Sequence, residues 1–173
     1  MRVAFDSRPG AAGHRAAQYS RCLLDALRDT ARDCDEIVET YRPRGAEVFH
    51  SPWLEGAMLH SPCPMVVTIH DVSALTRRSE RLRGGGVHLR LRSLALQRAT
   101  HVIVSTDALA EEAVAELGLE HERIAVIPHG SEAAPPTSLQ WQDAARATWR
   151  VYADALARPE RPCVGRLSRR PAA

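Results

Sequence analysis

The sequence predicts an α/β fold: a single domain with a doubly wound parallel sheet, and a C-terminal helix that packs back on it. Two observations indicate this class. Short apolar runs typical of buried strands alternate with amphipathic helical segments along the 173 residues, which favours right-handed crossovers between parallel strands. The last helical segment carries two Trp and one Tyr on one face, and such large aromatic side chains need a surface to cover them.

The first strand is expected at 2–6 (RVAFD), followed by the loop SRPGAAGH. The next segment has apolar residues at helical spacing and is therefore predicted to be an amphipathic helix: Tyr19, Cys22, Leu23, Ala26 and Leu27. A weaker strand is expected at 35–40 (DEIVET) and another at 46–51 (AEVFHS).

The clearest strand pattern lies at 64–71 (PMVVTIHD), where a continuous β-branched apolar run is typical of a strand buried on both faces. After the RGGG break, apolar residues at helical spacing mark a helix: Val87, Leu91, Leu94 and Ala95. A further buried strand is expected at 101–106 (HVIVST).

The segment DALAEEAVAELG predicts a helix with Thr106 or Asp107 as N-cap and Gly118 in the C′ position. The strand at 123–128 (RIAVIP) closes the series. We assign residues 1–131 to the domain, 132–137 to a linker, 138–157 to the last helix and 158–173 to a tail. The tail is basic and contains prolines, so we expect it to be disordered.

The last helix is predicted to start with a T-x-x-Q capping box made by Thr137 and Gln140. Its buried face is expected to hold Trp141, Ala145, Trp149, Tyr152 and Leu156, with Thr148 as the polar residue on that face.

Composition excludes several classes of protein. The formal net charge is only +2, which does not indicate nucleic-acid binding. The four Cys are scattered without a C-x-x-C pair, which favours reduced thiols in the cytoplasm. No run approaches the roughly 20 apolar residues needed to span a bilayer. We therefore expect a cytoplasmic protein.

Polar residues follow the predicted strands. In open parallel sheets, ligands bind beyond the carboxyl ends of the strands, and this edge is predicted to carry Asp6, His50, Ser51, His70, Asp71, Ser105, Thr106 and His129. The spacing of these residues matches no metal-ligand pattern. We expect no metal and no tightly bound cofactor.

Each of these residues also has a structural interpretation. His70 is either a ligand-facing donor and acid–base group or a strand-end residue bonded to a neighbouring carbonyl. Asp71 is a site residue or a turn and cap residue. For His50 and His129, a surface position and a site position are equally consistent with the sequence.

Two further segments are candidates for anion binding. The glycines of the loop GAAGH, including Gly13, could let backbone N–H groups approach a phosphate, although the spacing does not match G-x-G-x-x-G. The run RRSERLRGGGVHLRLR could meet anionic lipid headgroups or a phosphorylated acceptor through Arg77, Arg78, Arg81 and Arg83. The alternative interpretation of this run is a solvated helix face.

Five segments carry a family resemblance in this order: RVAFDSRP, YSRCLLDAL, EVFHSPW, PMVVTIHD and QRATHVIVSTDALAEEAVAELGLEHERIAVIPHG. Over residues 1 to about 131, the ordered set resembles the Rossmann-like N-terminal domain of the GT-B, family-four retaining glycosyltransferases. The resemblance implies a two-domain enzyme whose N-terminal domain binds the acceptor and whose C-terminal domain binds the nucleotide-sugar.

The resemblance also implies roles for particular residues. It makes His70 the catalytic-site histidine that faces the transferred sugar, and brings the loop of Gly13 near the donor diphosphate. The other strand-end residues become substrate-binding candidates. The sequence departs from the family at RAAQYSR (15–21), where Ala16 and Gln18 stand in place of the usual G-x-G-R-Y pattern.

Two interpretations of the last helix stay open: a helix returning from a donor domain, or an interdomain segment before CVGRLSRR, which resembles the first donor-domain strand. After the last helix, residues 158–173 do not carry the acidic E-x₇-E signature of that domain. We expect a truncated glycosyltransferase-family protein that is inactive alone and that a separate donor-domain polypeptide could complete. The alternatives are a non-catalytic module that binds a glycan, lipid headgroup or partner, and a small flavodoxin-like or sugar-phosphate enzyme.

Overall fold

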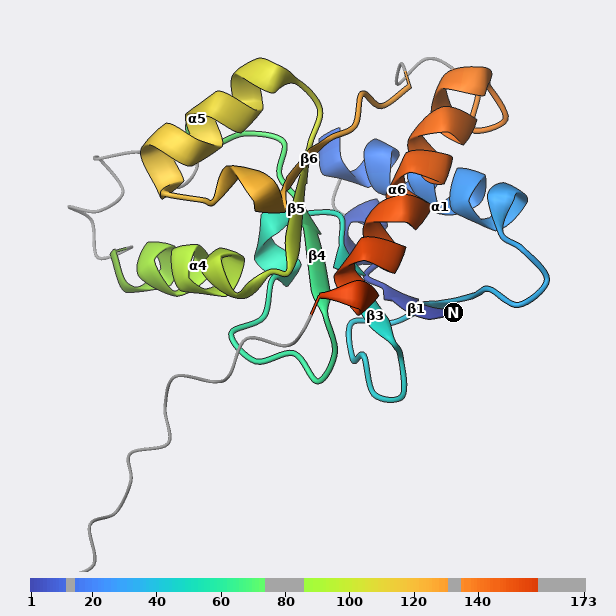
Figure 1. Ribbon diagram of the computed structural model, residues 1–173, viewed down its shortest axis with the longest axis horizontal. Helices are drawn as coiled ribbons and strands as arrows, with labels where there is room; N and C mark the ends of the chain where they lie inside the picture. The colour runs from blue at the N-terminus through green and yellow to red at the C-terminus, as the bar shows by residue number, and fades with distance from the viewer. Residues whose placement is uncertain (12–14, 74–85, 131–134, 159–173) are drawn as a thin grey trace, which may run out of the picture.

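The computed structural model describes residues 1–11, 15–73, 86–130 and 135–158 (Figure 1). Within them, one sheet has the strand order β2-β1-β3-β4-β5-β6, and every neighbouring pair is parallel. Its strands are β1 (Arg2–Phe5), β2 (Glu36–Glu39), β3 (Val48–Ser51), β4 (Met65–Thr68), β5 (His101–Val104) and β6 (Ile124–Val126). The predicted strands and the parallel fold class are confirmed.

Helices cover both faces of the sheet (Figure 1). They are α1 (Arg15–Thr30), α4 (Gly86–Arg98), α5 (Asp107–Leu117) and α6 (Leu139–Ala157). Figure 1 shows α1 and α6 on one side of the strands, and α4 and α5 on the other. The sheet is therefore doubly wound, and its last helix packs back on it.

Alternation along the strands divides the core into two layers. One layer lies between the sheet and the α1–α6 pair and includes Val3, Phe5, Val48, Val66 and Ile103. The other lies under α4 and α5 and includes Ala4, Phe49, Met65, Val67 and Val102. Because both faces of the central strands are covered, these strands are mostly apolar, and their polar residues lie at or near strand ends.

Helix α1 buries the predicted stripe from Tyr19 to Leu27. Of the stripe predicted for α4, only Ala95 is buried, whereas Val87, Leu91 and Leu94 are 67%, 41% and 53% exposed. Leu96 packs into the core, as does Ala99 directly after the helix. The helix is thus confirmed, but its inward face is turned away from three of the four residues that the spacing suggested.

Thr106 caps α5, because its hydroxyl accepts the N–H of Leu109 at 3.2 Å. Gly118 ends the helix in the left-handed conformation, with φ of 63°. Of the two N-caps that the sequence allowed, the structure uses Thr106 and leaves Asp107 in the first turn. There its carboxylate faces the positive end of the helix dipole.

The capping box predicted for α6 is wrong. Ser138 is the N-cap, so Gln140 occupies the second helical position rather than the third, where a capping box needs it. The Ser138 hydroxyl makes no capping hydrogen bond. On the buried face, Trp141 and Tyr152 are fully covered as expected, but Leu156 is 40% exposed.

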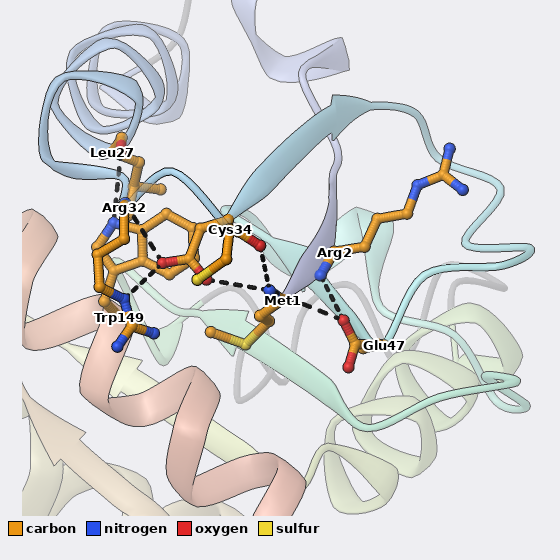
Figure 2. Close-up of polar contacts among 8 residues, drawn as sticks. Met1, Arg2, Leu27, Arg32, Cys34, Glu47 and Trp149 are labelled. Carbon is orange, nitrogen blue, oxygen red and sulfur yellow. Dashed lines mark hydrogen bonds and ion pairs between the residues drawn. The ribbon is translucent and has the colours of Figure 1, made fainter.

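Helix α6 is tied to the rest of the domain near the start of the chain (Figure 2). The indole Nε1 of Trp149 donates to the carbonyl of Leu27 at the end of α1, at 3.3 Å. Beside it, the Met1 ammonium donates to the carbonyl of Cys34 at 2.7 Å and pairs with Asp35 at 3.1 Å. Trp149 is half-buried rather than fully covered.

Several predicted features lie outside the described residues. They are Gly13, the arginines Arg77, Arg78, Arg81 and Arg83, the first half of the linker (132–134) and the tail after Arg158. Across the described ranges, no helix is long and apolar enough to cross a membrane.

Candidate functional site

Parallel strands bring their carboxyl ends to one edge of the sheet, and the predicted site residues follow those ends. Asp6 comes directly after β1, and His70 and Asp71 come shortly after β4. Ser105 follows β5, and His129 lies three residues after β6. The structure therefore gathers them on a shared edge, although their side chains differ widely in exposure.

The Asp6 carboxylate is fully buried and bound on several sides. Arg8 donates to both of its oxygens, through Nε at 2.8 Å and Nη2 at 2.7 Å, and the indole Nε1 of Trp53 donates at 3.0 Å. Burial raises the pKa of Asp6, but the hydrogen bonds from Arg8 and Trp53 outweigh it and hold this pKa below its usual value. Asp6 is an ionised anchor for Arg8 and Trp53.

Gly56 has no side chain, and this leaves space for the contacts of Asp6 with Arg8 and Trp53. It closes the short 3-10 helix Leu54–Gly56 after β3. A Cβ at this position would clash with the Ser51 hydroxyl and the Asp6 carboxylate, and would lie 2.7 Å from Trp53 Nε1. Ser51 itself donates to the Trp53 carbonyl at 2.6 Å. The Ser51 hydroxyl thus stabilises the turn that carries Trp53.

His50 lies below the edge, inside the core. Its side chain is fully buried, with Nδ1 2.5 Å from the Tyr152 hydroxyl on α6 and Nε2 3.0 Å from the Thr68 hydroxyl. Burial, and then the charge of nearby His70, lower the pKa of His50 to about 3, so the ring is neutral at physiological pH. Any effect of His50 on a substrate has to pass through its neighbours.

A buried chain of hydrogen bonds continues from His50 toward the surface. The Thr68 hydroxyl lies 3.3 Å from the hydroxyl of Tyr19, which is also buried. Burial raises the pKa of Tyr19 to about 12 and raises that of Tyr152 as well. All four groups in the chain Tyr152–His50–Thr68–Tyr19 are therefore neutral, and they position the Tyr19 ring.

Aromatic rings gather above Tyr19. The His70 ring meets Tyr19 edge-on at 4.7 Å between ring centres, and the His129 ring does so at 5.4 Å. Trp141 of α6 stacks on His129 at 5.8 Å with an interplanar angle of 13°. The His70 and His129 rings are 6.4 Å apart, and both side chains are half-buried. We call these four residues the histidine cluster.

Backbone contacts fix this cluster. The Nε2 of His70 is 3.0 Å from the carbonyl of Pro52, and because a carbonyl only accepts, Nε2 is the donor. In the neutral ring, Nδ1 is then the acceptor nitrogen. Gly130 lets the chain pass against Trp141, since a Cβ there would lie 2.5 Å from the indole ring.

Asp71 makes the local hydrogen bonds expected of a turn residue. It is exposed, and its carboxylate accepts the backbone N–H of Ser73 at 2.7 Å and the Ser73 hydroxyl at 2.6 Å. Ser105 is half-buried at the end of β5. Among the residues that the structure describes, no three His, Cys, Asp or Glu side chains form a group that could hold a metal ion.

The sequence reasoning missed several residues of this edge: Arg8, Tyr41, Trp53 and Thr68, together with the bond from Tyr152 to His50. One signal was available for Arg8, because it follows Asp6 at a spacing of two and a strand-end carboxylate needs a nearby cation. No local pattern connects His50 to a tyrosine that lies 102 residues away in the chain.

One comparison with known proteins bears on this site. A sequence model described as Glycosyltransferase Family 4 matches residues 5–133. The match includes Asp6, His50, His70 and His129 and ends before α6, which supplies Trp141 and Tyr152. No curated protein matches the chain.

Proposed function

The chain belongs to glycosyltransferase family 4, and from this premise we propose that it forms the acceptor side of a sugar transfer from a nucleotide-sugar. One observation supports the proposal most strongly. Within the family-matched residues, the carboxyl edge of the parallel sheet presents two half-buried imidazoles, His70 and His129, 6.4 Å apart. We further propose a GT-B arrangement and a retaining reaction, in the cytoplasm.

The histidine cluster has the chemistry to hold a sugar. Aromatic rings offer apolar faces, and the imidazole nitrogens can exchange hydrogen bonds with hydroxyl groups. Tyr19 and Trp141 restrict the orientations of both imidazoles. His70 is the residue that we propose to contact the sugar being transferred, with its Nε2 oriented by the Pro52 carbonyl.

Transfer also requires a nucleotide-sugar to be held beside the acceptor. Orientation of two reactants supplies about 7–11 kcal/mol of the barrier in well-aligned cases, and the departing diphosphate needs fixed donors or cations. We propose that a donor-binding unit supplies these groups, and that residues 1–158 do not transfer sugar without it. A separate polypeptide is one source of such a unit.

A second function is supported by one observation. Asp71 is occupied by Ser73, and His70 Nε2 by the Pro52 carbonyl, so both polar groups at the end of β4 already bind the protein itself. This arrangement also suits a non-catalytic module that binds a glycan, a lipid headgroup or a protein partner.

A radiolabel transfer assay separates the two functions. Purified chain is incubated with UDP- or GDP-sugars and with lipid or glycan acceptors, alone and with a co-expressed donor-binding domain. We expect turnover only in the combined sample, reduced about 100-fold or more by His70→Ala. The matched control is His121→Ala, an exposed histidine before β6. Acceptor binding without turnover in every combination would favour the non-catalytic module.

A further inference from the structure

A second group of side chains lies at the carboxyl edge, apart from the histidine cluster. Arg8 follows β1, Tyr41 and Arg42 follow β2, and Trp53 follows β3. We call these four residues the arginine cluster. Because the strand order is β2-β1-β3, the cluster lies across three neighbouring strand ends.

This place is also where the winding of the sheet changes direction. From β1 the chain goes first to β2 on one side of it and then to β3 on the other, so the direction of winding reverses here. In open α/β sheets, ligands bind where this reversal parts the loops beyond the carboxyl ends. Asp6 follows β1 and Trp53 follows β3, and a 3.0 Å hydrogen bond joins them across the reversal point.

Arg8 is held in place while part of its guanidinium stays available. Nε and Nη2 donate to the Asp6 carboxylate, and these bonds use two of the five guanidinium N–H groups. Nη1 donates to none of the residues that the structure describes. The side chain is 47% exposed. Its Nη1 edge therefore offers a preoriented pair of donors to an oxyanion.

A second cation, Arg42, contacts the same aromatic ring as Arg8. The Arg8 guanidinium lies over the Tyr41 ring at 4.5 Å, and the Arg42 guanidinium lies 5.2 Å from the same ring. The two cations thus share one aromatic side chain, which is 45% exposed. Tyr41 holds both of them by cation–π contact without neutralising either charge.

Both nearby carboxylates are engaged in ion pairs, and Asp6 offsets the charge of Arg8 from its buried side. Asp6 is fully buried beneath Arg8 and is shielded from solvent. Glu39, at the end of β2, pairs with Arg28 at 2.6 Å. A solvent-borne anion therefore meets Arg8 and Arg42 first, and the doubly charged phosphate monoester matches two cations better than a carboxylate does.

We propose that the arginine cluster binds the phosphate group of a phosphorylated acceptor; this inference rests on the acceptor-side function proposed above. The loop after β3 connects the two clusters, since Pro52 accepts from His70 and the next residue, Trp53, donates to Asp6. An acceptor lying along the edge thus places its phosphate at Arg8 and its hydroxyl group toward His70.

Calorimetry on the purified chain tests the inference with inorganic phosphate, glucose 6-phosphate and glucose. We expect both phosphates to bind and glucose not to bind. Arg8→Lys keeps a cation beside Asp6 but loses the planar fork, and should weaken phosphate binding about tenfold or more. Arg42→Gln leaves the buried Asp6–Arg8 pair intact and should weaken phosphate binding severalfold. Arg146→Gln, which removes an exposed arginine of α6, should change nothing.

Two further titrations identify the source of the phosphate. Arg8-dependent sedimentation with phosphatidic acid vesicles, but not with phosphatidylcholine vesicles, supports a lipid phosphate, whereas Arg8-dependent binding of glucose 6-phosphate supports a soluble one. Equal phosphate affinity in wild type, Arg8→Lys and Arg42→Gln overturns the inference. The inference is also overturned if UDP binds, Arg8→Lys abolishes that binding and phosphate monoesters do not bind. That result would assign the arginine cluster to the donor.

The two proposals fail in different ways. If phosphate esters do not bind, but the chain combined with a donor-binding domain transfers sugar to a neutral acceptor, the phosphate site is wrong and the transferase function stands. If phosphate binds through Arg8 and Arg42 but no combination transfers sugar, the site stands and the transferase function fails.

Discussion

Asp6 directly follows β1, His50 lies on the neighbouring strand β3, and the fold buries both side chains completely. Asp6 keeps its charge because Arg8 supplies an opposite charge and Trp53 a hydrogen bond. His50 is neutral because it is buried and its two partners are neutral hydroxyl groups. A buried ionisable group is tolerated in either way, and the choice determines how the domain responds to acid.

The first prediction is that stability falls as the pH falls from about 6.5 toward 4.5. The folded state holds His50 at a pKa of about 3, whereas an unfolded histidine has a pKa of about 6.5, so the unfolded state binds more protons in this window. The stabilisation is complete above about pH 6.5 and is lost toward pH 3. The slope from His50 alone reaches about 1.4 kcal/mol per pH unit, measurable by urea unfolding.

The control for this prediction is His50→Gln, which keeps hydrogen-bonding groups but does not titrate. This variant should lower the slope of the unfolding free energy against pH by about 1.4 kcal/mol per pH unit, the contribution of one proton. His101 contributes in the same direction, because burial lowers its pKa too, so some slope remains in the variant. Asp6, with its lowered pKa, loses its stabilising effect only at more acidic pH. Identical slopes for wild type and His50→Gln would contradict the neutral, buried ring.

A pair of glycines tests the packing around Asp6. Gly56→Ala should destabilise the domain by roughly 2–4 kcal/mol, because its Cβ meets Ser51, Asp6 and Trp53 at once. In Gly118→Ala the added Cβ meets no atom within 4 Å, so only the positive φ destabilises the variant, by about 1 kcal/mol. Unfolding by denaturant compares the two variants. Equal losses of stability in the two variants would show that the loop after β3 adjusts easily to the added Cβ.

At the scale of elements, α6 is part of the domain although the family match ends before it. Trp141→Ala should cost about 3–5 kcal/mol, since the side chain is fully buried and a cavity remains. Trp149→Ala should cost less, about 2 kcal/mol, because this side chain is only half-buried. Leu139→Ala, at a 75% exposed position, is the control and should stay within about 0.5 kcal/mol.

Thermal or denaturant unfolding of these three variants ranks the contacts of α6. If Trp141→Ala unfolds with the same midpoint as Leu139→Ala, the helix does not contribute to the core. That result would also remove the support for the histidine cluster, because Trp141 stacks directly on His129.

The strands were predictable because their apolar runs reflect burial on both faces, which requires no knowledge of the partner strand. Helix faces were harder to predict. In α4 apolar residues occur on more than one side, and the choice of Leu96 over Leu94 as a core residue depends on the sheet beneath. Likewise, Leu156 fits the spacing of α6 but lies near the end of that helix, where nothing covers it fully.

At the scale of the whole molecule, topology predicted which edge holds the polar residues, because parallel strands share one carboxyl edge. It did not predict which side chains face outward there. His50 belongs to a strand end in the sequence, but the alternation of the strand turns it toward α6. The arginine cluster escaped prediction because Arg8, Tyr41 and Trp53 are brought together by three separate loops.

The measurement that tests the central claim most directly is calorimetric titration of the chain with UDP- and GDP-sugars. The account assigns this domain to the acceptor side, so it predicts weak or undetectable binding of both donors, unchanged by His70→Ala. Addition of a donor-binding domain should be needed for tight binding. Micromolar donor affinity of the chain alone, lost in His70→Ala, would contradict the account and show that this domain holds the nucleotide-sugar itself.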